Sequence, residues 1–206
     1  MASLVIELQK DSLNPSIHIT DLLRKALLVS KKLKIKDIDE WLSNEMNGYT
    51  DKIPDYREVR GLIKGRDGYG RWIDFAVHSE IFEPFEYRKL PVPISQLETV
   101  LTQSEDGFFR LYFPSEAAAL LSNLMGGGYN PALSVPTHQI VKIIDVVKNK
   151  ILEFAVDLEN RGVFGEGMVF TQDEKEKAQN ITYNTINIHH MENSQLQQDS
   201  IGSKQS

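Results

Sequence analysis

The stretch between residues 137 and 161 constrains the fold most, because its hydrophobic side chains recur at the spacing of one long helical face. A stripe of this length is stable only when other elements cover it, since an isolated helix would leave it in water. Gly162 follows directly, and glycine is the residue that most often ends a helix. The sequence therefore predicts a helix-rich fold with a long C-terminal helix. The stripe consists of Ile140, Ile143, Ile144, Val147, Ile151, Phe154, Ala155 and Leu158.

Three further helices are predicted in the first 48 residues. The first spans residues 2–10. The second begins at Thr20, whose hydroxyl can accept a capping hydrogen bond. The third begins at Asp37, with Glu40 as its capping partner, and Gly48 ends it. This N-terminal three-helix segment is one of the main structural predictions.

Short β-like runs follow at residues 59–63 and 72–77, separated by a loop that contains three glycines. This arrangement is typical of a hairpin with a longer loop. Residues 108–113 form another strand candidate. Together with the helices, these runs predict an α+β fold with a small antiparallel sheet packed on helices. Along the last strand, Phe108, Arg110 and Tyr112 should face opposite to Phe109, Leu111 and Phe113.

A helix between this strand and the long C-terminal helix is predicted from its alanine and leucine content, with Ser115 as its cap. The glycine triplet at residues 126–128 ends it. The next three residues, Tyr129-Asn130-Pro131, are interpreted as a turn.

Composition excludes several classes of protein. The 206 residues carry a formal net charge of −6 and include no cysteine, which excludes disulfides, thiolate zinc sites and cysteine nucleophiles. An acidic chain has no general attraction for nucleic acid or anionic lipid, although a local basic patch is compatible with it. No apolar run reaches the roughly 20 residues of a membrane-spanning helix. We therefore expect a cytoplasmic protein without a membrane partner.

The segment between residues 57 and 71 is the main candidate for a ligand or nucleic-acid contact, because cations flank its glycines. Backbone amides and cations together can hold a phosphate. The segment lacks the Gly-Lys-Ser/Thr end of a phosphate-binding loop, so a hairpin loop with solvated charges is the favoured interpretation and nucleic-acid binding the alternative. The candidate residues are Arg57, Arg60, Lys64, Arg66 and Arg71.

Catalytic and metal-binding motifs give no assignment. The sequence contains neither a Gly-x-Ser-x-Gly elbow nor a His-Glu-x-x-His pair. The adjacent His189 and His190 would point to opposite faces of a strand and are poorly placed to share a metal. We therefore assign no catalytic residue, cofactor or metal, and regard a non-enzymatic protein as the favoured interpretation.

The composition becomes polar after residue 163. We expect the chain to divide there into a globular domain, residues 1–163, and a polar tail, residues 164–206. Thr171 and Glu174 form a capping-box pattern, which predicts a short helix at about residues 172–179.

The remainder of the tail, from Asn180 onward, is dominated by Asn, Gln, Ser and Thr and allows two interpretations. It is either a disordered linker or a segment that pairs with copies of itself. The second follows from its high β-propensity, low charge and Asn/Gln content, which favour cross-β stacking. Candidate self-association residues are Ile181, Tyr183, Ile186, Ile188, Asn193, Gln195 and Gln197.

Several short strings in the sequence carry a family resemblance. They are Ser3 to Gln9, Asp21 to Leu27, Glu40-Trp41, Glu45 to Tyr49, Pro54 to Arg57, Arg60-Gly61, Phe170 to Gln179 and Asn193 to Gln198. These strings resemble the AbiTii domain family of bacterial abortive-infection proteins, and the resemblance covers both ends of the chain well and residues 65–160 loosely. The resemblance implies a role in defence against phage but supplies no catalytic residue.

The sequence thus favours a non-enzymatic defence component, which binds a protein partner or a phage-derived trigger and forms homo-oligomers through its tail. Two alternatives stay open. One is a nucleic-acid or nucleotide binding module that uses the basic segment 57–71. The other is a toxic effector enzyme, such as a nuclease, whose site is assembled from residues distant in the sequence.

Overall fold

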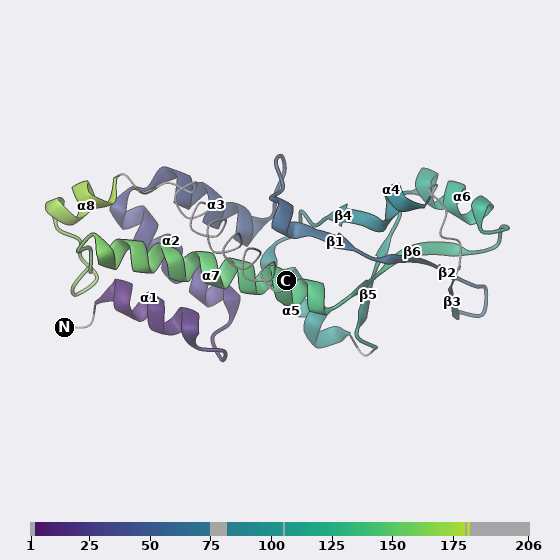
Figure 1. Ribbon diagram of the computed structural model, residues 1–206, viewed down its shortest axis with the longest axis horizontal. Coiled ribbons are helices and arrows are strands. Elements are labelled where there is room, and N and C mark those ends of the chain that lie inside the picture. Colours follow the sequence, from purple (N-terminus) through teal and green to yellow (C-terminus); the bar gives the residue numbers. More distant parts are fainter. Residues whose placement is uncertain (1–2, 75–81, 105, 180, 182–206) are drawn as a thin grey trace, which may run out of the picture. The chain divides into compact units, whose positions relative to one another are not determined.

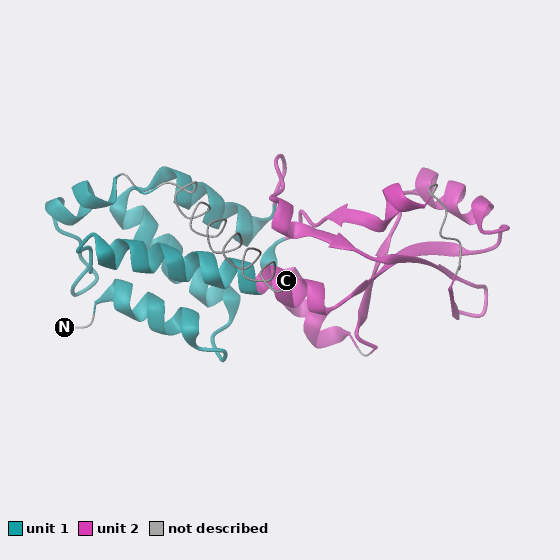
Figure 2. Ribbon diagram, in the orientation of Figure 1, with its two compact units in different colours: residues 1–48, 93–95, 145–206 teal, residues 49–92, 96–144 magenta. Residues whose placement is uncertain are grey.

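The computed structural model describes residues 3–74, 82–104, 106–179 and 181, and it confirms an α+β, helix-rich fold with small antiparallel sheets. The chain forms two compact units (Figure 2). Unit 1 comprises residues 1–48, 93–95 and 145–206, and unit 2 comprises residues 49–92 and 96–144.

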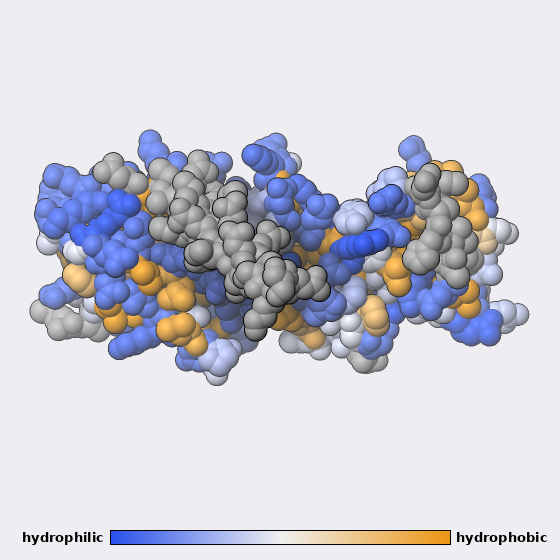
Figure 3. Space-filling model, viewed as in Figure 1, coloured by the Kyte–Doolittle hydropathy of each residue, from blue (hydrophilic) through white to orange (hydrophobic). Residues whose placement is uncertain are grey.

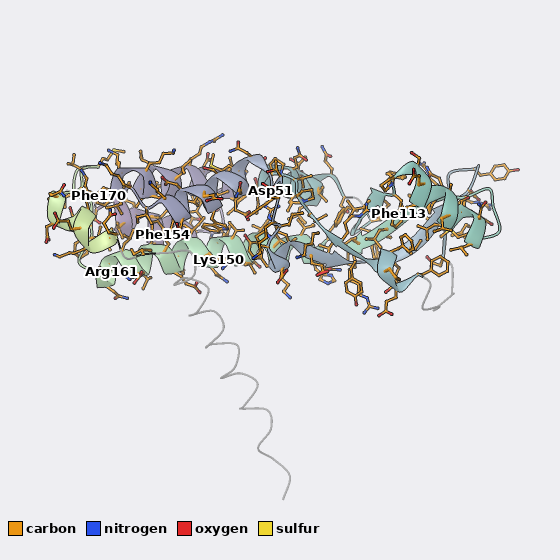
Figure 4. All side chains as sticks on the ribbon, turned by 90° about the horizontal axis from the view of Figure 1, so that it is seen from above. Asp51, Phe113, Lys150, Phe154, Arg161 and Phe170 are labelled. Atoms are coloured by element: carbon orange, nitrogen blue, oxygen red, sulfur yellow. The ribbon has the colours of Figure 1, made fainter. Side chains whose placement is uncertain are left out.

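Unit 1 is helical (Figure 1). Helices α1 (Leu4–Leu13), α2 (Ile19–Leu33) and α3 (Lys36–Asn47) confirm the predicted N-terminal segment. The long helix α7 (His138–Asn160) contributes its residues 145–160 to this unit. Every residue of the predicted apolar stripe on α7 is buried, and Phe154 among them is fully enclosed (Figure 4). The period of the hydrophobic residues therefore predicted both the helix and its buried face.

The predicted starts of two helices are wrong. Helix α2 begins at Ile19 with His18 at the N-cap, so Thr20 lies inside the first turn. Helix α3 begins at Lys36 with Ile35 at the N-cap. Both Ile19 and Ile35 are buried. We infer that burial of these side chains decides where the helices begin, overriding the local preference for a hydroxyl or carboxylate cap.

The segment after α7 also belongs to unit 1. Phe170 is buried, and helix α8 (Gln172–Ala178) confirms the predicted short helix. Both hydrogen bonds of its capping box, between Thr171 and Glu174, are present. Ala178 and Ile181 are buried as well, so this segment adds to the core of unit 1. The division of the chain after residue 163 into independent parts stays a prediction, and residues 182–206 lie outside the described part.

Unit 2 contains two antiparallel sheets. A four-stranded sheet has the order β3 (Trp72–Asp74), β2 (Leu62–Arg66), β6 (Asn130–Pro136) and β5 (Phe108–Tyr112). A two-stranded sheet joins β1 (Glu58–Arg60) to β4 (Tyr87–Lys89). The pairing of β2 with β3 confirms the predicted hairpin, and residues 75–77 of its predicted second strand lie outside the described residues. The helical elements of this unit are η1 (Asp55–Arg57), α4 (Glu83–Glu86), α6 (Ser115–Leu124), most of α5 (Ile94–Gln103) and residues 138–144 of α7.

The predicted strand at residues 59–63 is in fact two strands in different sheets. Gly61 separates them and donates its N–H to the Glu86 carbonyl (2.9 Å). A Cβ at this position would lie 2.6 Å from the Ser134 carbonyl oxygen, well inside van der Waals contact. Only glycine lets the chain pass this close to β6 while it changes sheets.

The central strand β6 was missed, and the interpretation of Tyr129-Asn130-Pro131 as a turn is wrong for its last two residues. The strand is buried on both faces over residues 131–135 and so shows no polar alternation. Proline near each end also argues against a central strand. The predicted cap at Ser115 is wrong too, because α6 begins at this residue with Pro114 at the N-cap.

One face of the four-stranded sheet is part of the core of unit 2. Ile63, Leu133 and Val135 are buried there, and the strand register places Ile63 opposite Leu133. Phe113, which follows β5, is also buried and packs edge-on against Phe85 with ring centroids 6.1 Å apart (Figure 4). The large side chains on the opposite face of the sheet define the candidate site.

Candidate nucleic-acid interface

Alternation along the strands and the cross-strand register place a set of basic and aromatic side chains on one face of the four-stranded sheet, here called the basic–aromatic face. Lys64 lies opposite Asp74 and Ala132, and Arg110 lies opposite Ser134. The members of the face are Leu62, Lys64, Arg66, Trp72, Asp74, Phe108, Arg110, Tyr112, Asn130, Ala132 and Ser134.

Small residues on β6 let larger side chains meet across the sheet. The rings of Trp72 on β3 and Tyr112 on β5 have centroids 6.5 Å apart, although β2 and β6 separate their strands. The rings reach each other only by leaning over the strands between them, where Ala132 and Ser134 are short enough to leave room. Both small residues are buried as a result.

Cations and aromatic rings alternate on this face. The Arg110 guanidinium lies 5.2 Å from the centroid of Trp72 and 5.6 Å from that of Phe108. Arg66 lies 5.9 Å from the centroid of Trp72, and the Lys64 ammonium lies 5.6 Å from that of Phe108. Each contact is within cation–π range. Some of the rings on the basic–aromatic face are accessible to solvent. Tyr112 is 50% exposed and Phe108 is 36% exposed.

Two carboxylates partly neutralise the face. Lys64 pairs with Asp74 at 2.8 Å, and Arg110 pairs with Asp106 at 2.6 Å. The Arg110 guanidinium hydrogen-bonds to Asp106 and lowers the pKa of this carboxyl to about 2. Asp106 is therefore ionised across the neutral range. An incoming anion must compete with both carboxylates for Lys64 and Arg110, whereas Arg66 donates to the Gly70 carbonyl (3.2 Å).

Two members of the basic–aromatic face have a buried polar atom. Ser134 Oγ and Arg110 Nε are enclosed and have no hydrogen-bond partner within the described part of the chain. An unpaired buried polar atom costs free energy, so both atoms have hydrogen-bonding capacity that the described residues leave unused.

The structure separates the five cations predicted from the sequence. Lys64 and Arg66 lie on the basic–aromatic face. Arg71 lies in the hairpin loop and pairs with Asp67 at 2.8 Å. Arg60 lies on β1 and pairs with Glu86 at 2.8 Å. These last two belong to other local clusters.

Arg57, the fifth candidate, has a structural role. It is fully buried, and its guanidinium donates to the carbonyl oxygens of Leu90 (3.0 Å) and Val92 (2.7 Å). Its guanidinium also lies 4.9 Å from the ring centroid of Tyr49. Arg57 therefore fastens segments of unit 2 together and is not available to a ligand.

Sequence reasoning missed Trp72, Phe108, Arg110 and Tyr112 as site residues. The signal was present, because the predicted alternation in residues 108–113 had already grouped the last three on one face, and the register confirms this grouping. Their meeting with Trp72 depends on β6, the strand that was not predicted.

Unit 1 contains a different charged cluster. Glu45 on α3 and Lys150 on α7 are buried, and Figure 4 labels Lys150. Burial lowers the pKa of Lys150, while the nearby carboxylates of Glu153 and Glu45 act to raise it. These charges compensate each other inside a helical bundle, which is typical of a structural network. Among the described residues, no group of three or more His, Asp or Glu side chains could hold a metal ion.

Of the candidate self-association residues, Ile181 is described and is buried in unit 1. Tyr183, Ile186, Ile188, Asn193, Gln195 and Gln197 lie outside the described residues. Self-association through these residues stays a prediction.

Comparison with protein families gives one match. The family model for AbiTii matches residues 3–183, which includes both units. The chain belongs to the AbiTii family. Membership implies a role in bacterial abortive infection, a defence against phage, and confirms the resemblance seen in the sequence. No curated protein and no solved structure matches this AbiTii chain.

None of the helices that the described residues of the AbiTii chain form is both long and apolar enough to cross a bilayer.

Proposed function

We propose that this AbiTii protein acts in abortive infection as a non-enzymatic sensing module, whose basic–aromatic face binds single-stranded nucleic acid. The observation that carries the proposal is the alternation of Arg66, Trp72, Arg110, Phe108 and Lys64 on one face of the sheet. Proteins that bind single strands combine such stacking platforms with cations that contact the backbone.

The aromatic residues account for the preference for single strands. Bases in a duplex are stacked on one another, whereas an unpaired base has a free face that can lie on Tyr112 or Phe108. Stacking contributes about 1–3 kcal/mol per base and tolerates any sequence, because every base has a π face. The face therefore favours unpaired strands without requiring a particular sequence.

The cations account for phosphate binding despite the acidic chain. Asp74 is 78% exposed in its pair with Lys64, and exposed ion pairs are worth only about 0–1 kcal/mol. A phosphate can therefore displace this carboxylate at low cost. Removing the carboxylate should release Lys64 and strengthen binding, an effect that a purely structural ion pair would not produce.

The proposal is tested by fluorescence anisotropy of labelled single-stranded RNA and DNA, with a duplex of the same sequence as the comparison. Tyr112→Ala and Phe108→Ala should each weaken single-strand binding by roughly fivefold or more. Lys64→Ala should lower the slope of log affinity against log salt by about 0.7. Asp74→Asn should raise the affinity.

Arg60→Ala is the matched control, because Arg60 is an exposed, ion-paired arginine of unit 2 that lies outside the face. It should leave binding nearly unchanged. Absence of salt-sensitive binding by the unmodified protein at low salt would refute the proposal. Equal losses in Arg60→Ala and Tyr112→Ala would also refute it. If a protein partner instead loses affinity in Tyr112→Ala while nucleic acid never binds, the face is a protein-binding surface.

A further inference from the structure

The loop between α7 and α8 exposes hydrophobic side chains at one end of unit 1. Val169 is 66%, Met168 52% and Phe164 38% exposed, although Val163 and Phe170 beside them are buried. Figure 1 shows this loop at the end of unit 1 where α1 begins, and Figure 4 shows Arg161 and Phe170 at the same end. Buried residues therefore anchor both ends of the loop, and the hydrophobic residues between them are exposed to solvent.

Hydrogen bonds hold the loop in one conformation. The Glu174 carboxylate accepts from the backbone N–H of Phe164 (2.8 Å) and of Gly165 (3.0 Å). The Ser3 hydroxyl donates to the Phe164 carbonyl (2.6 Å), and the Lys32 ammonium donates to the Met168 carbonyl (2.7 Å). The exposed side chains are therefore displayed by an anchored loop.

Met168 is held in a backbone conformation that its side chain disfavours. Its φ is 64°, in the left-handed region that glycine adopts freely and that costs other residues about 1 kcal/mol or more. The flanking Gly165 and Gly167 have positive φ as well. A glycine at position 168 would remove the strain, so the methionine side chain is present at a cost to stability.

Lysines at the C-terminal end of α2 lie near the loop. Lys32 contacts it directly, and Lys31 and Lys34 lie within two residues of Lys32 along the chain and are exposed. Lys34 is itself the left-handed C-cap of α2, with φ of 63°. Glu166 is the exposed acidic residue inside the loop. Figure 3 shows hydrophobic residues beside hydrophilic ones at this end of unit 1.

From these observations we infer that the tip of the α7–α8 loop inserts into the surface of an anionic lipid membrane, with Lys31, Lys32 and Lys34 contacting the headgroups. Exposed Met, Val and Phe side chains close to three lysines match the two requirements of peripheral attachment, apolar area that can be buried and attraction to anionic lipid. A protein partner fits less well, because lysine is depleted in protein interfaces and the loop lacks tryptophan and tyrosine.

This attachment differs from a transmembrane helix and rests on a different unit from the proposed nucleic-acid face. The expectation of no membrane partner followed from the net charge and the absence of a long apolar run. Neither property excludes a local patch of three lysines beside an apolar tip.

The inference is tested by co-sedimentation of the full chain with vesicles of phosphatidylcholine alone and with roughly a quarter phosphatidylglycerol, the anionic component. The protein should bind the anionic vesicles and not the neutral ones. Lys32→Ala combined with Lys34→Ala should weaken binding by at least about tenfold, since each lysine near an anionic surface contributes roughly fivefold.

Two variants separate insertion from folding. Met168→Gly removes the apolar side chain and relieves the strained φ, so it should weaken vesicle binding severalfold while thermal stability stays equal or rises. Leu13→Ser is the matched control, because Leu13 is 70% exposed in the same unit at the far end of α1. It should bind vesicles like the unmodified chain. No binding to anionic vesicles, or equal binding by Met168→Gly and the unmodified chain, overturns the inference.

Discussion

At the scale of single residues, Glu174 shows how one carboxylate organises a loop. Burial acts to raise its pKa, but hydrogen bonds from the backbone N–H groups of Gly165, Phe164 and Thr171 outweigh burial and lower the pKa below its ordinary value of 4.5. Because the folded pKa lies below the unfolded one, ionised Glu174 stabilises the fold above the unfolded pKa. This contribution disappears as the pH falls through the folded pKa.

Glu174→Gln should therefore lower the free energy of unfolding by roughly 1–2 kcal/mol at neutral pH. The difference from the unmodified protein should shrink as the pH falls below about 4. Urea unfolding at both pH values measures it. Glu176→Gln is the control, because Glu176 is exposed on the same helix and pairs with Gln172 (3.0 Å). Equal unfolding curves for Glu174→Gln and Glu176→Gln would contradict the assigned role.

The sequence predicted part of this network. The capping box could be predicted from the spacing of Thr171 and Glu174, because both partners lie within one turn of the chain. The hydrogen bonds that Glu174 accepts from the backbone of Phe164 and Gly165 could not be predicted, since they depend on how the loop folds back toward α8. The candidate site shows the same difference. Lys64 and Arg66 were predicted from the local charge of the sequence, whereas the role of Trp72 depends on the register of the sheet.

At the scale of elements, Gly61 decides where one strand ends and the next begins. Gly61→Ala should destabilise the protein by about 1–3 kcal/mol, because the added methyl would meet the Ser134 carbonyl at 2.6 Å and Leu133 Cγ at 2.8 Å. Thermal unfolding measures the loss. Gly68→Ala is the control, since a Cβ at Gly68 meets nothing within 4 Å in the described structure. Similar melting temperatures for the two variants would show that β6 can move aside.

Elements with a strong period were predictable and buried strands were not. The stripe of α7 repeats over many turns, so the sequence identified the helix nearly to its ends. Strand β6 is buried on both faces and has a proline near each end, so its residues resemble a turn followed by an apolar run. Because β6 lies between β2 and β5, missing it also hid the face on which Trp72 and Tyr112 meet.

At the scale of the whole molecule, the position of a truncation decides what a test of the tail can reveal. Residues 163–181 include the buried side chains of Val163, Phe170, Ala178 and Ile181. A chain that ends at Gly162 loses all four from unit 1, so a change in its mass would mix unfolding with loss of self-association. A chain that ends at Ile181 keeps them and removes only the residues that follow.

The predicted self-association is tested with the chain ending at Ile181. If residues 182–206 pair with copies of themselves, the full chain should form species larger than a monomer at high concentration. The shortened chain should then be monomeric with an unchanged melting temperature, because its core is intact. Light scattering measures the masses, and thermal unfolding checks the fold. Asn193→Pro with Gln195→Pro in the full chain should act like the truncation, since proline cannot join a ladder of strands. Equal monomer masses for all three chains would show that residues 182–206 play no part in assembly. Self-association of these residues would then add no avidity to ligand binding by the folded units.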